Sequence, residues 1–334
     1  ILLLEKSIRM GKEPSASPDE GNDEASFRHF LVGSATSGLF ARVLCHPLDT
    51  CKSKIQGPEG NKFTSTPQTL TKIFRQEGIP GLYKGFGAVF VGGTPGLVIY
   101  LTSYELLKNT LVPVFGGSKY ESLAHIFSGF VAEALCCVTF VPVDVVKERM
   151  QVQGSATSFA YKNSLDAFKQ IMQQEGLRGI YKGYGATLLS FGPYSALYFA
   201  FYEKMKEFAC EIEESSVDTL SFKYLVASAT GSACLASWLT NPLDLAKLRL
   251  QVQRSSSLAI KHNADGLKRS AVAHSPHHSQ QYSSMLDGVA KIYRAEGLRG
   301  LYRGAGARVA FQAPNMALTV SLFDVCKNFF AQYI

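Results

Sequence analysis

The chain has 334 residues, of which 46% are hydrophobic and 18% charged, and its net charge is +7. The mean hydropathy is near zero, which is low for helices that face only lipid and typical of helices that surround a polar interior. Three segments, 52–84, 147–182 and 247–303, hold 22 of the 34 lysines and arginines, and apolar runs separate them. These runs argue against a nucleic-acid-binding surface, so no nucleic-acid partner is expected.

The chain is predicted to be an all-α membrane protein with a disordered, polar tail at 1–26. The remainder divides into three similar repeats, 27–115, 116–212 and 213–334. In each repeat we expect a long membrane helix, a short amphipathic surface helix and a second long membrane helix, giving six spans under threefold pseudosymmetry. The expected helices cover about residues 27–55, 66–76, 85–111, 123–153, 164–174, 183–210, 220–252, 285–295 and 304–330.

The third repeat carries an insertion, about residues 254–281, that is rich in serine and histidine. His274, His277 and His278 could bind a metal ion, but nothing in this stretch supplies a folded environment for one. We therefore expect a solvated, disordered loop and no metal site. The seven cysteines have no Cys-x-x-Cys spacing, and several lie in apolar runs, which is typical of reduced, buried thiols.

One pattern occurs three times, Pro-x-Asp-x-x-Lys-x-[Lys/Arg]-x-Gln, at 47–56, 142–151 and 242–251. In each copy the aspartate and the first lysine are three residues apart, so they share one face of a helix. If three kinked helices converge, each lysine can meet the aspartate of the neighbouring repeat. Ionisable side chains near a membrane need partners, so a ring of such pairs is predicted to close a pore at one mouth. Its residues are Asp49, Lys52, Asp144, Lys147, Asp244 and Lys247.

Two further patterns follow in every repeat. The first is Glu-Gly-x-x-x-x-Tyr-[Lys/Arg]-Gly, at 77–85, 175–183 and 296–304. Its glycines place backbone N–H groups at helix N-termini, which bind anions, although plain helix capping explains them as well. The second is an aromatic-acidic-x-x-Lys pattern at 104–108, 202–206 and 323–327, which predicts a second ring of ion pairs at the opposite mouth.

Taken together, the three patterns resemble those of the mitochondrial carrier family over about residues 27–330. The resemblance implies a monomer that carries a small solute across the mitochondrial inner membrane by alternating access, with no cofactor. Two breakable ion-pair rings suit this mechanism, because buried ion pairs return little net free energy. An enzyme is disfavoured, since the sequence has no phosphate-binding loop, His-Glu-x-x-His or Gly-x-Ser-x-Gly element. A non-transporting membrane scaffold on the same fold is the remaining alternative.

The resemblance also implies roles for the repeated residues. The first ring becomes the matrix gate, and the glutamines Gln56, Gln151 and Gln251 become its braces. Phe323 lacks the hydroxyl of its two tyrosine counterparts, so the third brace of the second ring is expected to be absent. That ring, the cytoplasmic gate, comprises Tyr104, Glu105, Lys108, Tyr202, Glu203, Lys206, Phe323, Asp324 and Lys327. The residues implied to bind cardiolipin phosphates are Gly78, Gly85, Gly176, Gly183, Gly297 and Gly304.

The family reads its solute at fixed distances from the repeated glycines and prolines. Arg42 and Glu133 are the charged residues at these positions, and a charge within an apolar run is a functional-site candidate, unless the two simply pair with each other. The substrate-binding residues implied are Arg42, Gly92, Gly93, Glu133, Cys137, Ser190, Phe191, Ser237, Phe311 and Gln312.

Two branches of the family compete for the solute. Residues 132–149 resemble the third helix of S-adenosylmethionine carriers, and residues 304–315 resemble mitoferrins, which carry iron. Arg42 departs from both branches, and Cys136 stands where mitoferrins have a histidine. An arginine repels a bare metal ion but pairs with the anionic group of a zwitterion. We therefore expect S-adenosylmethionine or a similar small zwitterion or cation, with a mitoferrin-like iron transporter as the alternative.

Overall fold

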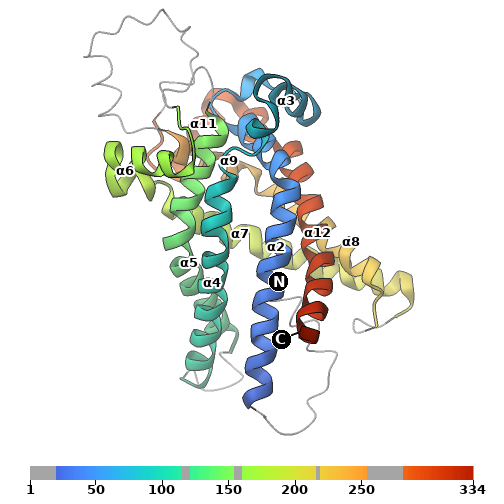
Figure 1. Ribbon diagram of the computed structural model, residues 1–334. Coiled ribbons are helices and arrows are strands. Elements are labelled where there is room, and N and C mark those ends of the chain that lie inside the picture. Colours follow the sequence, from blue (N-terminus) through green and yellow to red (C-terminus); the bar gives the residue numbers. More distant parts are fainter. Residues whose placement is uncertain (1–19, 115–120, 154–159, 216–218, 254–280, 334) are drawn as a thin grey trace, which may run out of the picture. The chain divides into compact units, whose positions relative to one another are not determined.

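The computed structural model describes residues 20–114, 121–153, 160–215, 219–253 and 281–333. Its regular elements are all helices in these residues, which confirms the predicted all-α class (Figure 1). The predicted loop at 254–281, with its three histidines, lies outside the described residues except for residue 281.

Each repeat contains a long odd helix, a surface helix and a long even helix. The first repeat has α2 (Glu20–Gln56), a 3-10 turn η1 (Gly60–Lys62), α3 (Thr66–Leu82) and α4 (Phe86–Val114). The second has α5 (Glu121–Val152), α6 (Ser164–Ile180) and α7 (Tyr184–Glu213). The third has α8 (Phe222–Leu239), α9 (Asn241–Val252), α11 (Met285–Leu301) and α12 (Ala305–Tyr333).

The predicted boundary of the N-terminal tail needs a correction. We expected disorder through residue 26, but α2 already begins at Glu20. Residues 20–24 include three acidic residues, and negative charge favours a helix N-terminus because it opposes the positive end of the helix dipole. Residues 1–19 lie outside the described part of the chain.

The surface helices run further than predicted because each consists of two helical segments. The break lies at Gly78, Gly176 and Gly297, whose φ angles are 66°, 65° and 66°. Glycine adopts this left-handed conformation without the steric strain of a Cβ atom. The predicted ends of the surface helices therefore fall close to the end of the first segment, and a second short segment leads to the even helix.

The third odd helix is interrupted at its proline, whereas the first two are continuous. Pro47 and Pro142 lie inside α2 and α5. In the third repeat α8 ends at Leu239, and α9 starts at Asn241 with Pro242 in its first turn. Proline has no N–H to donate and clashes with the preceding turn, so it favours a break here, although Pro47 and Pro142 do not interrupt their helices. The single helix predicted for 220–252 is therefore two helices.

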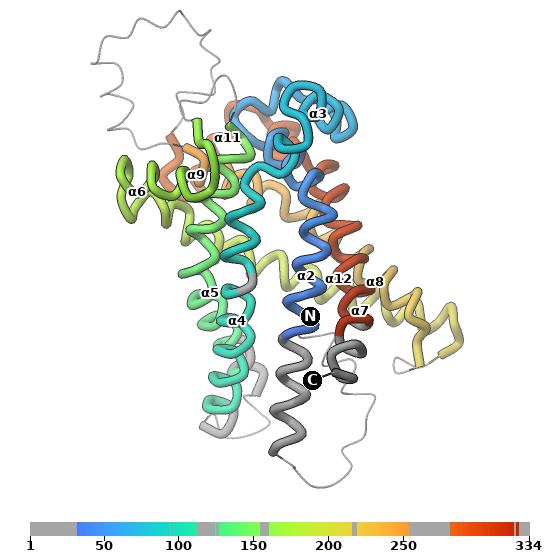
Figure 2. Tube along the Cα trace, viewed as in Figure 1, coloured from blue at the N-terminus to red at the C-terminus, as the bar shows by residue number. Residues whose placement is uncertain are grey.

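The chain forms two compact units. In the described part of the chain, one lies within residues 1–45, 193–239 and 309–334, and the other lies within 46–192 and 240–308. We call them unit 1 and unit 2. Within unit 2, α4 and α5 lie side by side along their length, and α6 crosses the end of α5 (Figures 1 and 2). The three surface helices belong to unit 2, together with the odd-helix segments that follow each repeat proline.

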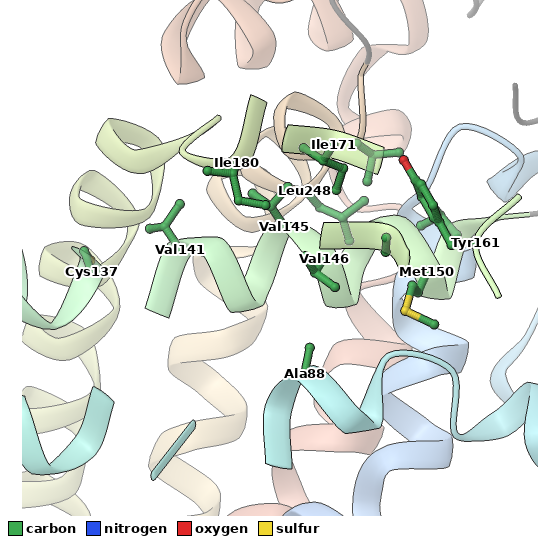
Figure 3. Packing of buried hydrophobic residues seen from close by; sticks show 13 residues of the cluster. Ala88, Cys137, Val141, Val145, Val146, Met150, Tyr161, Ile171, Ile180 and Leu248 are labelled. Carbon is green, nitrogen blue, oxygen red and sulfur yellow. The ribbon is translucent and has the colours of Figure 1, made fainter. Parts of the chain in front are cut away.

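In each repeat the surface helix packs against its odd helix through apolar side chains. In the second repeat Val145 of α5 meets Ile171 and Ile180 of α6, and Leu248 of α9 joins them (Figure 3). The first repeat buries Cys51 against Ile73, and the third has an equivalent cluster. Burying one such side chain contributes about 1.5–3 kcal/mol. Each surface helix is thus fixed to the odd helix of its own repeat.

Length and hydropathy alone select two segments of the described chain, 66–111 and 127–152, as apolar enough to cross a membrane. The other long helices include charged or small polar side chains, such as Asp49 and Lys52 in α2 and Ser228 in α8. A helix that lines a polar interior does not need to be apolar on all sides.

Candidate functional site

Unit 2 contains a closed ring of three ion pairs between repeats. Each lysine of the Pro-x-Asp-x-x-Lys pattern lies against the aspartate of a neighbouring repeat, so the three contacts form a cycle. The Nζ–Oδ2 distances are 2.7 Å for Lys52–Asp244, 2.9 Å for Lys147–Asp49 and 2.8 Å for Lys247–Asp144. We call this set of six side chains the aspartate–lysine ring.

The ring is largely shielded from solvent. Its side chains are between 4% and 17% exposed, with Asp49 the most buried. Charges of opposite sign alternate around the cycle, so every buried charge has a partner. Removing one partner of a buried pair costs about 3–5 kcal/mol, because the remaining charge is left desolvated.

The three predicted brace glutamines lie at the ring, but they do not all contact an aspartate. Gln151 donates to Asp49 at 3.3 Å, and Gln251 donates to Asp144 at 3.2 Å. Gln56 donates instead to Asn241 Oδ1 at 3.0 Å. The Asn241 amide in turn donates to the Leu301 carbonyl oxygen at 2.8 Å. Asn241 precedes a repeat proline, where the second repeat has a valine, so the sequence patterns gave no sign of this role.

A second set of ion pairs lies two residues further along each odd helix. The second basic residue of each pattern contacts the glutamate that opens the Glu-Gly pattern of its own repeat. These pairs are Lys54–Glu77 at 2.7 Å, Arg149 Nη2–Glu175 Oε2 at 3.1 Å and Arg249–Glu296 at 2.6 Å. We call this set the glutamate ring. Both partners recur at the same spacing in all three repeats, but their pairing was not predicted from the sequence.

The basic residues of the glutamate ring also contact the neighbouring repeat. Lys54 donates to the Gln153 carbonyl at 3.5 Å, Arg149 to Gln251 at 3.1 Å, and Arg249 to Gln56 at 3.4 Å. Each acceptor is a carbonyl at the C-terminal end of an odd helix, where the helix dipole is negative. Each basic side chain therefore bridges its own surface helix and the next helix end.

The basic residue that precedes the last glycine of the Glu-Gly pattern, Lys84, Lys182 or Arg303, has a different partner in the second repeat. Lys84 and Arg303 pair with the glutamates of their own repeats at 2.5 and 2.8 Å. Arg149 contacts both oxygens of Glu175, and Lys182 donates to the Gln253 carbonyl at 2.8 Å. Lys182 lies between α6 and α7, outside the spanning helices. Burial lowers its pKa to about 8, against the opposing attraction of Glu175.

Three of the predicted lipid-binding glycines allow repeats to approach each other closely. Gly85, Gly183 and Gly304 have φ angles of 78°, 83° and 75° and immediately precede α4, α7 and α12. A Cβ atom on Gly183 would lie 2.8 Å from the Gln251 Cγ atom of the next repeat. Both backbone conformation and close packing thus require glycine here.

The residues predicted for the cytoplasmic gate are divided between the two units. In unit 2, Lys108 pairs with Glu105 of the same helix at 3.1 Å. In unit 1, the Lys206 ammonium lies 5.5 Å from the ring centre of Tyr202, and Glu203 is exposed. Tyr104 stacks on Tyr100, again within α4. Phe323 is buried, whereas the side chains of Asp324 and Lys327 lie outside the described residues.

Six of the predicted substrate-binding residues lie in the α4, α5 and α7 segments of unit 2, and Glu133 is the only charged one among them. Cys137 donates to the Glu133 carboxylate at 3.5 Å, one turn along α5. A Cβ atom on Gly92 would collide with Val143, so helix packing alone explains this glycine. Gly93 has no such neighbour. Ser190 donates to the Ala186 carbonyl within α7 at 2.7 Å. Phe191 is 40% exposed.

The other four predicted residues lie in unit 1. Arg42 and Phe311 are half-buried, Ser237 is buried, and Gln312 donates to the Tyr194 hydroxyl at 2.8 Å.

Tyr194 begins a column of stacked aromatic rings on α7. Its ring and that of Tyr198 have centres 6.3 Å apart, and those of Tyr198 and Tyr202 are 5.9 Å apart, with interplanar angles of 17° and 8°. We call these three residues the tyrosine column. It extends from Gln312, a predicted solute contact, to Lys206 at the predicted cytoplasmic gate. The sequence contains the four-residue spacing of this column, but sequence analysis did not single it out.

The sequence model of the family described as "Mitochondrial carrier protein" matches residues 23–114, 118–212 and 218–333. The chain belongs to the mitochondrial carrier family. Similar proteins include "Mitochondrial substrate carrier family protein E" of Dictyostelium discoideum, 33% identical over 94% of this chain and 100% of that protein. A mitoferrin of the same organism is 32% identical over 92% of this chain and 96% of its own length. The chloroplastic nicotinamide adenine dinucleotide transporter 1 of Arabidopsis thaliana is 27% identical over 96% of this chain and 97% of its own length.

Membership establishes the general activity of this mitochondrial carrier. Proteins of the family transport solutes across a membrane and are not enzymes, as the sequence predicted. The described residues of the carrier contain no group of three or more histidine, cysteine, aspartate or glutamate side chains that could hold a metal ion.

Proposed function

We propose that this carrier moves a small adenosine-bearing zwitterion or cation, of the S-adenosylmethionine kind, across the mitochondrial inner membrane by alternating access. The inner membrane is the expected location because the relatives named above include mitochondrial carriers, although one of them is chloroplastic. The observation that carries the choice of solute is the tyrosine column with Gln312 at its end.

The aspartate–lysine ring supports the proposed mechanism. Its three pairs each join two repeats, so separating the repeats at this end breaks all of them. A buried ion pair returns little net free energy after desolvation, so such a ring can open at modest cost if its charges are rehydrated. We assign it the role of matrix gate, with Gln56, Gln151 and Gln251 as braces.

The tyrosine column supports an aromatic solute. Stacking of a base on an aromatic side chain contributes about 1–3 kcal/mol, and Tyr194 and Tyr198 are partly exposed, whereas Tyr202 is buried. Because the nearly parallel rings lie one helical turn apart, a moving base could stack on successive tyrosines along α7. A bare metal ion would gain nothing specific from such a column apart from cation–π attraction.

The two charged contact residues support a zwitterion. Taken separately, Arg42 can pair with an anionic group and Glu133 with a cationic group, and each pairing offsets the desolvation of a partly buried charge. Because Cys137 contacts the Glu133 carboxylate through a weak thiol hydrogen bond, a cationic group can replace that contact readily.

Ferrous iron is the second candidate, and the Glu133–Cys137 contact favours it. A carboxylate and a thiol are both ligands for iron, and one of the similar proteins is named a mitoferrin. Against iron, the described residues contain no group of three or more histidine, cysteine, aspartate or glutamate side chains that could hold a metal ion. We therefore rank iron below an organic solute.

Cardiolipin is the proposed lipid partner of the carrier. Gly78, Gly176 and Gly297 are each followed by an exposed apolar residue, Ile79, Leu177 or Leu298. The even helices begin just after the second set of glycines, and free N–H groups at helix N-termini favour phosphate. An apolar contact beside an anion site fits a lipid with a phosphate headgroup.

The test is uptake by purified carrier in liposomes. S-adenosylmethionine, nicotinamide adenine dinucleotide and ferrous iron are supplied in turn, and uptake of S-adenosylmethionine is the expected result. Tyr198→Leu should lower this uptake several-fold, whereas Tyr198→Phe, which keeps the ring, should retain most of it. Uptake of iron with no competition from S-adenosylmethionine would contradict the choice of solute.

A further inference from the structure

Two charged residues at the aspartate–lysine ring have no counterpart in the other repeats. Glu148 follows Lys147, where the first and third repeats have Ser53 and Leu248. Arg308 lies four residues beyond Gly304, where the other repeats have valine and threonine. Threefold symmetry therefore does not account for either residue. Their charges are opposite, so together they leave the net charge of the ring unchanged.

Glu148 contacts a ring lysine of its own helix. Its carboxylate Oε1 is 3.1 Å from Lys147 Nζ, and its side chain is 5% exposed. Adjacent helical residues point in different directions, so this contact depends on the length of the lysine side chain. The other oxygen, Oε2, is buried and accepts no hydrogen bond from the described residues. Glu148 can therefore form a second contact with Lys147 through Oε2 when Lys147 loses Asp49.

Arg308 contacts a ring aspartate of its own repeat. Its Nε is 3.4 Å from Asp244 Oδ2, and its Nη1 donates to the Thr240 hydroxyl at 3.0 Å. Asp244 therefore forms ion pairs with Lys52 from the first repeat and Arg308 from the third, and Lys247 of its own helix attracts it more weakly.

The two kinds of contact respond differently when repeats separate. The Lys147–Asp49 and Lys52–Asp244 contacts join different repeats and are lost. Glu148 stays with Lys147, and Arg308 stays with Asp244, because each belongs to the same repeat as its partner. The open state therefore does not leave Lys147 or Asp244 as a lone desolvated charge, which is the expensive outcome for a broken buried pair.

We propose that Glu148 and Arg308 are reserve partners that hold Lys147 and Asp244 when the aspartate–lysine ring opens, and so are positioning residues for gate opening. This inference rests on the proposed role of the ring as a gate. The inference predicts easier opening at two of the three interfaces, the one between repeats 1 and 2 and the one between repeats 1 and 3. At the third, between repeats 2 and 3, the intra-repeat contact of Asp144 is the longer one to Lys147, at 3.9 Å.

The opposite role, an extra clamp on the closed ring, makes the opposite prediction. If Glu148 and Arg308 are reserve partners, neutralising them makes opening harder. If they are clamps, neutralising them makes opening easier. Glu148 also attracts Lys247 of the neighbouring repeat, which favours the closed ring, so the test removes that lysine first.

The experiment measures the open fraction directly and needs no solute. Spin labels are placed on exposed surface-helix positions of the full-length carrier in lipid nanodiscs, at Arg75, Gln173 and Arg294. The seven native cysteines are replaced, and distances between label pairs are recorded by electron paramagnetic resonance. In a Lys247→Gln background, which lacks the repeat 2–3 pair, a population with longer distances should appear.

In that background Glu148→Gln and Arg308→Gln should each lower the long-distance fraction about fivefold, the change that corresponds to a modest ion pair. Glu148→Asp and Arg308→Lys, which keep the charge, should restore part of it. The matched control is Glu207→Gln, which removes an exposed intra-helical pair and should change nothing. Melting temperatures identify any variant that fails to fold.

A rise in the open fraction, or no change, on neutralising Glu148 and Arg308 overturns the inference. If Lys247→Gln itself produces no long-distance population, the ring is not a gate, and the proposed mechanism fails together with this inference. The two failures are therefore distinguishable.

Discussion

The aspartate–lysine ring and the glutamate ring use the same chemistry two residues apart, yet they join different parts of the carrier. The first ring joins repeats to one another, for example Lys147 to Asp49. The second joins the odd helix to the surface helix of one repeat, for example Arg149 to Glu175. Under the proposed gate mechanism, ion pairs between repeats open during transport, whereas pairs within a repeat persist. The basic residues of the glutamate ring also donate to a carbonyl of the next repeat, and the mechanism requires these weaker contacts to break.

Helix geometry explains how one short pattern makes both rings. Two residues along an α-helix correspond to a rotation of about 200°. Lys52 and Lys54 therefore leave α2 on nearly opposite sides, the first toward Asp244 and the second toward Glu77 of α3. The same holds for Lys147 and the arginine at 149.

The largest expected effect comes from reversing one charge of the aspartate–lysine ring. Lys147→Asp places a fourth buried carboxylate beside Asp49, Asp144 and Glu148, and the loss of the lysine costs about 3–5 kcal/mol. We expect uptake into liposomes to be nearly abolished. The double variant Lys147→Asp/Asp49→Lys restores opposite charges across the same contact and should recover part of the rate. Normal uptake by the single variant would contradict the role of the ring.

Removing a glutamate of the glutamate ring should affect stability in the order of burial. Glu175 is 1% exposed, Glu296 6% and Glu77 25%. Glu175→Gln leaves the buried Arg149 without its carboxylate, at a cost of about 3–5 kcal/mol, and Glu77→Gln should cost clearly less. Thermal unfolding of the purified variants checks this order. Equal losses for all three would show that burial does not set the contribution of these pairs.

A comparison of Gly176 and Gly183 distinguishes the cost of backbone strain from the cost of close packing between repeats. Gly176 has φ 65°, and none of the described residues comes within 4 Å of a Cβ atom there, so Gly176→Ala should cost about 1 kcal/mol of strain. Gly183 has φ 83° and lies against Gln251 of the next repeat, so Gly183→Ala should add about 1–3 kcal/mol of overpacking. Melting temperatures compare the two. A larger loss at Gly176 would contradict the close approach at Gly183.

The smallest expected effect concerns pH and the unmatched Lys182. Its pKa in the folded carrier is about 8, below the ordinary value of 10.5, because burial disfavours the charged form. Between these two values the unfolded chain binds more protons than the folded one, so the contribution of Lys182 to stability rises with pH from about 8 to 10.5. Unfolding at pH 7 and at about pH 9.5 should therefore show a larger gain for the wild type than for Lys182→Met. Equal gains would contradict the lowered pKa.

The repeated patterns predicted the helices well because each repeat carries the same punctuation at the same spacing. Gly78, Gly176 and Gly297 set the break in the surface helices, and this break was not predicted, since a glycine in sequence does not reveal its φ angle. The split between α8 and α9 was missed for a related reason. Pro47, Pro142 and Pro242 are alike in sequence, and only the third interrupts its helix.

For the site, sequence analysis identified the residues that are alike in all repeats and overlooked those that are not. The aspartates and lysines were visible through repetition. Glu148 and Arg308 each occur once, so no pattern marked them. Gly92 was predicted as a solute contact, yet its closeness to Val143 of the neighbouring helix gives it a packing role that only three-dimensional contacts reveal.

The most direct test of the account is to lock one contact of each ring. Cysteines are introduced at Asp49 and Lys147 in one variant, and at Glu77 and Lys54 in another, and each pair is joined by a short reducible bifunctional thiol reagent. The account predicts that the first cross-link, between repeats, stops uptake until it is reduced, while the second, within a repeat, leaves uptake close to that of the unlinked variant. Uptake that continues with Asp49 and Lys147 positions joined would contradict the claim that the aspartate–lysine ring opens during transport.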